Sequence, residues 1–364
     1  MSMNHQTALA PTASPRFEWR APLGPWRWLI LGTLGVAPSS GGGRTVGADP
    51  DRDDADLEGQ AGDRTSSPPR ADHSIAEAPN GSRATSFCIV GRPFLIDGAV
   101  CLAASAARHD WYPSERTAVA PAVEAGEASS AAIARGWTEQ ALMEHASVAA
   151  FARFALQLLQ LGAPAELVER ASAAMQDEIR HARACFDLAR RHSTQDVGPG
   201  PLAVEGALDR MDPASIVLDA LREGCIGETV AAIQAAEALS HCEDPAARAV
   251  LERIAEEEGK HAELAWRFVA WAIETRPELF ERVQDAFARE LTGVRSGGAR
   301  GLRDASPADR ELARHGLLSA PLRAALRQRV LANVIAPCSE ALLDGAGWQR
   351  PDSRRVVRRT PHAA

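Results

Sequence analysis

Two copies of the pattern Glu-x-x-His occur in the chain, one at Glu178 and His181 and the other at Glu258 and His261. Residues three positions apart lie on one face of an α-helix, so each pattern places a carboxylate beside an imidazole. Each pair interrupts a helical face that is otherwise apolar, which predicts that its side chains point into a core. Carboxylates and imidazoles that converge in a core are typical ligands of a transition metal ion.

Each pattern follows a helical stretch that carries one glutamate on its apolar face, Glu144 in the first case and Glu228 in the second. Turns at residues 162–164 and 242–245 would bring the glutamate and the pattern of each hairpin to the same level, within roughly one helical turn or 5 Å. Burying these charges unpaired would cost several kcal/mol each, so a cation should neutralise them. The repeated order predicts a two-metal site in a four-helix bundle. The candidate ligands are Glu144, Glu178, His181, Glu228, Glu258 and His261.

Other polar residues near the patterns fit the ligand geometry less well. Glu256 and Glu257 fall off the apolar face, which predicts that both are solvated. His145 is rotated by about 100° from the neighbouring glutamate, so we expect it to pack against the bundle or to contact a ligand indirectly. Cys185 and Cys225 point inward. They are either small apolar core residues or additional soft ligands.

The stretch from about residue 137 to 271 resembles the ferritin-like superfamily of di-iron carboxylate proteins. The strings EHASVAAFARF, GCIGETVAA and GKHAELAWRFVAWA are similar to uncharacterised bacterial members, and the similarity continues into VIAPCSEAL. The resemblance implies the six residues above as ligands, with Glu178 and Glu258 bridging two metal ions. Four carboxylates and two imidazoles favour iron or manganese, or a mixed pair, over zinc or copper.

We therefore expect an all-α fold, with a ferritin-like four-helix bundle over residues 131–276. The long connection after His192 would be the crossover that this topology requires. Residues 277–346 should form additional helices, and 347–364 a basic disordered tail. Those additional helices are expected over Pro277–Leu291, over Ser306–Leu318 with Ser306 as N-cap, and over Pro321–Leu343.

The N-terminal part divides into a signal-like, disordered leader and linker (1–84) and a small β-hairpin segment with a linker (85–130). An apolar run within residues 16–37 has the length of a secretory signal, but Pro38 follows the expected cleavage site. Export and a cytoplasmic location both stay open. In an exported protein, Cys88 and Cys101 on neighbouring strands would form a disulfide.

The net charge of −8 argues against a nucleic-acid partner. Apart from the signal-like run, no membrane span is expected, and the sequence leaves the oligomeric state open. Three functions fit: an oxidoreductase that activates O2 or peroxide, with a small-molecule substrate or an electron donor; an iron-handling protein; and a structural metal site. The only tyrosine, Tyr112, lies outside the expected bundle, which argues against a buried tyrosyl radical. The terminal extensions disfavour a storage cage.

Overall fold

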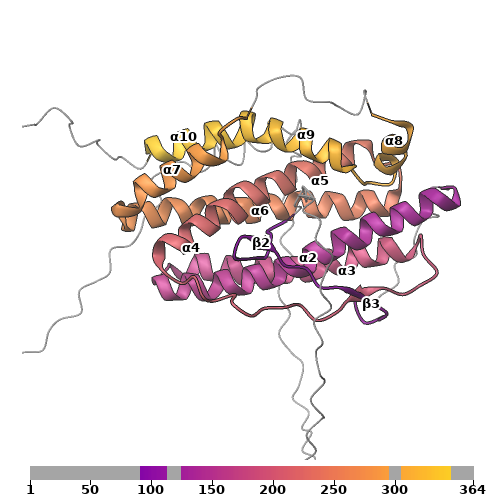
Figure 1. Cartoon of the computed structure of the whole chain (residues 1–364), viewed down its shortest axis with the longest axis horizontal. Coiled ribbons are helices and arrows are strands. Elements are labelled where there is room, and N and C mark those ends of the chain that lie inside the picture. The colour runs from indigo at the N-terminus through magenta and orange to yellow at the C-terminus, as the bar shows by residue number, and fades with distance from the viewer. Residues whose placement is uncertain (1–90, 113–123, 295–304, 346–364) are drawn as a thin grey trace, which may run out of the picture. The chain divides into compact units, whose positions relative to one another are not determined.

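The computed structural model describes residues 91–112, 124–294 and 305–345, and these residues are mostly helical (Figure 1). The predicted leader and linker (1–84), with its signal-like run, and the predicted basic tail (347–364) lie outside the described residues. None of the helices in the described ranges combines the length and apolar character that a membrane crossing needs.

The first helical hairpin consists of α2 (Glu127–Leu161) and α3 (Ala165–Arg190). Gly162 ends α2 in the left-handed conformation (φ 69°), and its N–H donates to carbonyls of the last helical turn. Pro164 then occupies the N-cap position of α3 with a non-helical ψ of 144°, so the helix begins at the next residue. The turn predicted at residues 162–164 is confirmed.

The second hairpin begins with α4 (Pro213–Asp219), which continues through the π-helical segment η1 (Ala220–Glu228) into α5 (Thr229–His241). After a short turn, α6 runs from Pro245 to Thr275. Aspartates cap both starts: Asp212 accepts from Ser215 N, and Asp244 accepts from the N–H groups of residues 246 and 247. The sequence predicted the helix but not its π-helical middle.

The two hairpins share one core. Helix α2 packs along α3, α6 packs along η1 and α5, and α3 contacts α6 (Figure 1). Phe154 of α2 and Phe268 of α6 meet edge to face with ring centroids 5.1 Å apart. The faces that carry the predicted ligands therefore turn toward a common interior.

The connection between the hairpins is held by strands that the sequence did not predict there. β4 (Gly198–Pro199) pairs antiparallel with β3 (Ser105–Ala106). The Tyr112 hydroxyl also donates to Val197 O (3.1 Å) and accepts from Val197 N (2.7 Å). The N-terminal segment thus fixes the path of the long connection.

Ahead of α2, β1 (Leu95–Ile96) and β2 (Ala99–Val100) form a hairpin. Asp97 and Gly98 make its turn with φ of 50° and 78°, as expected for this dipeptide. Cys101 follows the hairpin and has no disulfide partner among the described residues, while Cys88 lies outside them. The disulfide stays a prediction.

The C-terminal helices pack on the second hairpin. They begin with the short η2 (Pro277–Leu279) and α7 (Phe280–Glu290) and end with α8 (Pro307–Arg314), α9 (Ala320–Val330), the π-helical η4 (Leu331–Ile335) and α10 (Ala336–Gly345). Helix α9 contacts α5, and α8 contacts both α2 and α5. The predicted N-cap at Ser306 forms a full capping box with Asp309. Helix α8 ends before the predicted Leu318, because Gly316 turns the chain with φ 81°.

Candidate metal centre

All six predicted ligands come together in the interior, and each is no more than 2% exposed. Helix α2 supplies Glu144, the last residue of η1 is Glu228, and α3 and α6 supply the two Glu-x-x-His pairs. The π-helical turns end at a candidate ligand, which is where such bulges often occur.

The six side chains form two overlapping groups of four. One group contains Glu144 and His181, and the other contains Glu228 and His261. Glu178 and Glu258 belong to both groups, and within each group the candidate ligand atoms lie within 4.8 Å of one another. Two shared carboxylates between two separate Glu/His pairs are the arrangement expected for two bridged metal ions.

The Nδ1 atoms of both histidines face the shared carboxylates. His181 Nδ1 lies 3.7 Å from Glu178 Oε2 and 3.6 Å from Glu258 Oε1. His261 Nδ1 lies 3.2 Å from Glu178 Oε1 and 3.6 Å from Glu258 Oε2. Each imidazole therefore offers one nitrogen to the space between the glutamates.

Most ligand atoms that face this space lack a hydrogen-bond partner. Both carboxylate oxygens of Glu178, Glu228 and Glu258 are in this state, as are one oxygen of Glu144 and the Nδ1 atoms of both histidines. The other Glu144 oxygen accepts from Gln140 Nε2 at 2.6 Å. Buried acceptors without partners are costly, and a cation would satisfy them together. The residues therefore fit a pair of metal ions.

The pKa shifts in the metal-free protein also favour a site for cations. Burial and the neighbouring carboxylates raise the pKa of Glu144 and of Glu228 well above the usual range. Burial opposes the charged form of His261, but contacts with Asp177, Glu178 and Glu258 outweigh it and raise its pKa. In the metal-free protein, bound protons therefore neutralise part of the negative charge that metal ions would otherwise neutralise.

Each histidine is oriented by an acid from the other hairpin. His181 Nε2 lies 2.7 Å from Glu257 Oε2, and His261 Nε2 lies 3.0 Å from Asp177 Oδ2. Arg180 forms ion pairs with both acids. An acid on Nε2 fixes the ring so that Nδ1 is presented as a ligand, as is common in metal sites.

The prediction that Glu257 is solvated is therefore wrong. Its side chain is 17% exposed and lies between α6 and α3, because a 100° rotation from Glu258 points it at the neighbouring helix and not at solvent. Glu256 is solvated as predicted: its side chain is 68% exposed and pairs with Lys260. One sequence feature could have distinguished Glu257 from Glu256. An acid directly precedes the glutamate of both patterns, in Asp177-Glu178 and in Glu257-Glu258.

The remaining predicted neighbours stay outside both groups. His145 packs edge to face on Trp111 at 4.9 Å, as expected for a packed histidine. Cys185 and Cys225 are fully buried, and burial raises the pKa of both thiols well above the usual range. Neither belongs to a described ligand group, which favours their interpretation as small apolar core residues.

The loop at residues 91–93 covers the site. A side chain at Gly91 would begin 3.1 Å from Ser147 Oγ and 3.4 Å from Glu144 Oε2, and Ser147 Oγ donates to Arg92 O at 2.8 Å. Gly227 leaves room for Pro93, and Gly224 for Ala265. The small residues beside these ligands thus allow close packing instead of leaving space.

A buried ion-pair chain, which sequence reasoning missed, adjoins this loop. Glu223 of η1 accepts from Arg153 Nη2 at 2.6 Å and pairs with Arg92 Nε at 3.5 Å. Arg92 is 1% exposed and lies over the rings of Phe151 and Phe154. A pocket adjoins these ion pairs at Arg153, and its lining also includes Leu95, Asp219 and Arg222.

No protein-family model, curated protein or solved structure matches this chain. The functional assignment therefore rests on the geometry of the site.

Proposed function

We propose that this protein is a ferritin-like di-iron carboxylate protein, with iron or a mixed iron–manganese pair, that acts as an oxidoreductase on O2 or peroxide. The proposal rests mainly on the two ligand groups, which share Glu178 and Glu258. Most of the acceptor atoms that face their common space have no hydrogen-bond partner. A single structural metal ion would need only four ligands. Here six buried side chains converge, which suits two ions.

The ligand types favour iron or manganese. Carboxylate oxygens outnumber imidazole nitrogens by four to two, and no thiolate belongs to either group. Hard oxygen donors suit Fe(II) and Mn(II) better than Zn(II) or Cu(I). Two such ions would supply redox chemistry toward O2 that the side chains cannot perform themselves.

The protein residues have separable roles in this proposal. Glu178 and Glu258, which belong to both ligand groups, would be shared by the two ions, and Glu144 with His181 and Glu228 with His261 would complete the two positions. Asp177 and Glu257 keep the imidazoles in the orientation that presents Nδ1. The loop at residues 91–93 covers the site, and Ser147 of α2 donates to it through the carbonyl of Arg92.

One observation favours an iron-handling function as the second candidate. Pro93 and Ala265 occupy the space beside Gly227 and Gly224, so an organic substrate has little room next to Glu228. Small species such as Fe(II), O2 and peroxide need less room. A ferroxidase without organic substrate is therefore the alternative to an enzyme that oxidises one.

Oxygen consumption separates these functions. Metal-free protein is loaded anaerobically with two Fe(II) per chain, exposed to O2, and then supplied with excess Fe(II). An oxidoreductase consumes O2 once, to oxidise the bound iron pair, and its O2 uptake does not increase with the added Fe(II). A ferroxidase continues in proportion to added Fe(II). The variant Glu258→Ala is the control and should lose both behaviours. Tight metal binding by a protein that is inert toward O2 and peroxide would refute the redox proposal.

A further inference from the structure

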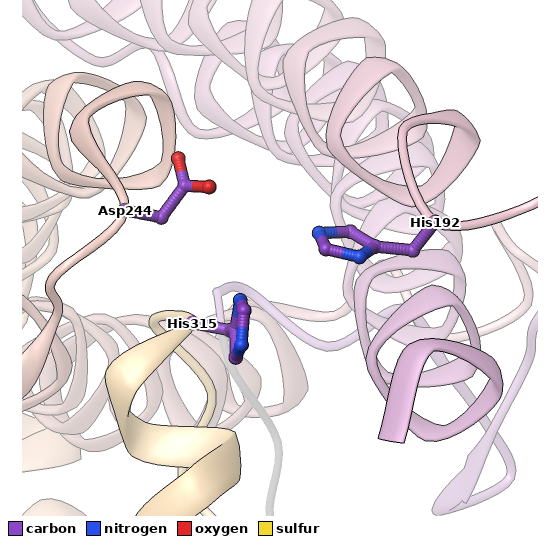
Figure 2. A group of neighbouring side chains, drawn as sticks. All are labelled: His192, Asp244 and His315. Carbon is purple, nitrogen blue, oxygen red and sulfur yellow. The ribbon is translucent and has the colours of Figure 1, made fainter. Parts of the chain in front are cut away.

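A second cluster of side chains that could bind a metal lies away from the dinuclear centre, which comprises the six candidate ligands of the two overlapping groups. His192 follows the end of α3, Asp244 caps the start of α6, and His315 follows the end of α8; Figure 2 shows the three side chains pointing toward one another. One ligand atom from each lies within 4.8 Å of the others. Three segments that are distant in the sequence thus place two imidazoles and one carboxylate together.

This cluster is separate from the six ligands described above. His192 lies eleven positions after His181, and Asp244 fourteen positions before Glu258. At 1.5 Å per helical residue, these spacings correspond to roughly 15–20 Å along the helices. The two groups share no residue, so binding at one does not require the other.

The state of the His315 side chain indicates that a ligand binds at this cluster. Its side chain is fully buried, yet neither ring nitrogen has a hydrogen-bond partner. The nearest acid oxygen, Glu311 Oε1, lies 3.4 Å from Nε2 without hydrogen-bond geometry, and the His192 ring meets His315 edge to face at 5.4 Å. A buried imidazole normally bonds through at least one nitrogen. A metal ion between the two rings would satisfy it.

Asp244 is fixed in place independently of any metal. Its Oδ1 accepts from the N–H groups of Ala246 and Ala247 at 2.8 and 3.0 Å, and Arg191 Nη1 lies 3.1 Å from the same oxygen. These contacts hold the carboxylate opposite the two rings. Burial lowers the pKa of His192, and the neighbouring His315 lowers it further, which favours the neutral imidazole that binds a metal.

We propose that His192, Asp244 and His315 form a mononuclear site for a divalent transition metal ion. Two imidazoles and one carboxylate suit Zn²⁺ and Co²⁺, and they leave coordination positions for water or a small ligand. Bound metal would link the turn between α8 and α9 to the end of α3 and the start of α6, and would thereby fasten the C-terminal helices to the two hairpins.

Metal counting on the full chain tests the proposal. Metal-free wild type and variants are saturated with Co²⁺, desalted and analysed for cobalt per chain. Wild type should retain three ions, two in the dinuclear centre and one here. His192→Ala should retain two, because this half-buried residue lies in a turn and its loss should not affect folding. Asp244→Asn, which preserves the helix cap, should also lose the third ion.

Two controls make the result specific. His241→Ala removes a histidine from the end of α5 that belongs to no ligand group, and it should retain three ions. Glu258→Ala should lose ions from the dinuclear centre but keep the one at His192. The cobalt counts of the two variants therefore report the loss of each site separately. Equal cobalt counts in wild type and His192→Ala would overturn the proposal, whatever their value.

Discussion

Glu257 on α6 contacts His181 on α3 at 2.7 Å between Oε2 and Nε2, so an acid of the second hairpin orients a candidate ligand of the first. Asp177 does the same for His261 in the opposite direction. The position of each imidazole therefore depends on how α3 packs against α6. Metal affinity should respond to residues that would not themselves touch a metal.

Glu257→Ala should lower the metal affinity of the dinuclear centre about 10- to 100-fold while that centre still binds two ions, because the His181 ring loses its orienting acceptor. Competition with a chelator of known affinity measures the change. Glu257→Gln keeps an acceptor oxygen and should recover part of the loss. Glu256→Ala is the matched control at a solvated position and should bind as wild type does. Wild-type affinity in Glu257→Ala would contradict the role assigned to this contact.

Helical periodicity was enough to predict the six candidate ligands, because each interrupts an apolar face and the side-chain direction follows from the residue number. It could not identify Glu257, whose role depends on the distance between α3 and α6. It also missed Glu223, because the π-helical turns of η1 change the side-chain phase that an α-helical period assumes. His192 and His315 lie in turns, where no period applies.

Glu178→Ala or Glu258→Ala should leave at most one bound metal ion per chain, since each of these carboxylates belongs to both ligand groups. Glu144→Ala removes a residue of one group only and should preserve binding in the other. Elemental analysis after desalting, on a His192→Ala background, counts only the dinuclear centre. Two ions retained in Glu178→Ala and in Glu258→Ala would refute the bridging assignment.

The metal-free protein should lose stability as the pH rises from about 6 to 8. Burial first, and then nearby carboxylates, raise the pKa of Glu144 and Glu228, and contacts with acids raise the pKa of His181 and His261 despite burial. Above the ordinary values of 4.5 and 6.5, the folded state therefore binds more protons than the unfolded chain, so stability falls with pH.

Metal ions should reverse this trend, because they replace those protons. Calorimetry at pH 6 and pH 8 should show a larger rise in Tm on metal loading at pH 8. The pKa of Glu258, Asp177 and Glu257 is lowered, so their contributions are lost only in more acidic solution, below about pH 4.5. A metal-free protein that is more stable at pH 8 than at pH 6 would contradict this prediction.

Gly91→Ala should weaken metal binding in addition to straining the backbone. Its φ is 80°, and the added Cβ would lie 3.1 Å from Ser147 Oγ and 3.4 Å from Glu144 Oε2. Gly98→Ala is the matched control, with φ 78° and nothing within 4 Å of the added carbon. Both variants should lose about 1 kcal/mol of folding stability from the left-handed conformation. Only Gly91→Ala should show a reduced metal affinity by chelator competition; an equal effect of both would assign the change to strain.

Glu223→Ala should reduce the free energy of unfolding by about 3–5 kcal/mol, because it leaves the buried Arg92 without its carboxylate. Urea denaturation of the metal-free protein measures this effect without a contribution from metal affinity. The control is Glu290→Ala, which removes the partly exposed partner of Arg222 and should cost no more than about 1 kcal/mol. Similar losses in the two variants would show that the buried chain adds no special stability.

The exchange of acids between the two Glu-x-x-His patterns has a consequence for each hairpin taken alone. Each hairpin supplies one glutamate, one Glu-x-x-His pair and an acid that serves only the other hairpin. One hairpin alone lacks the acid that orients its histidine. Two separate hairpins would therefore orient both histidines only when they associate, so each half of the bundle depends on the other for its complete ligand geometry.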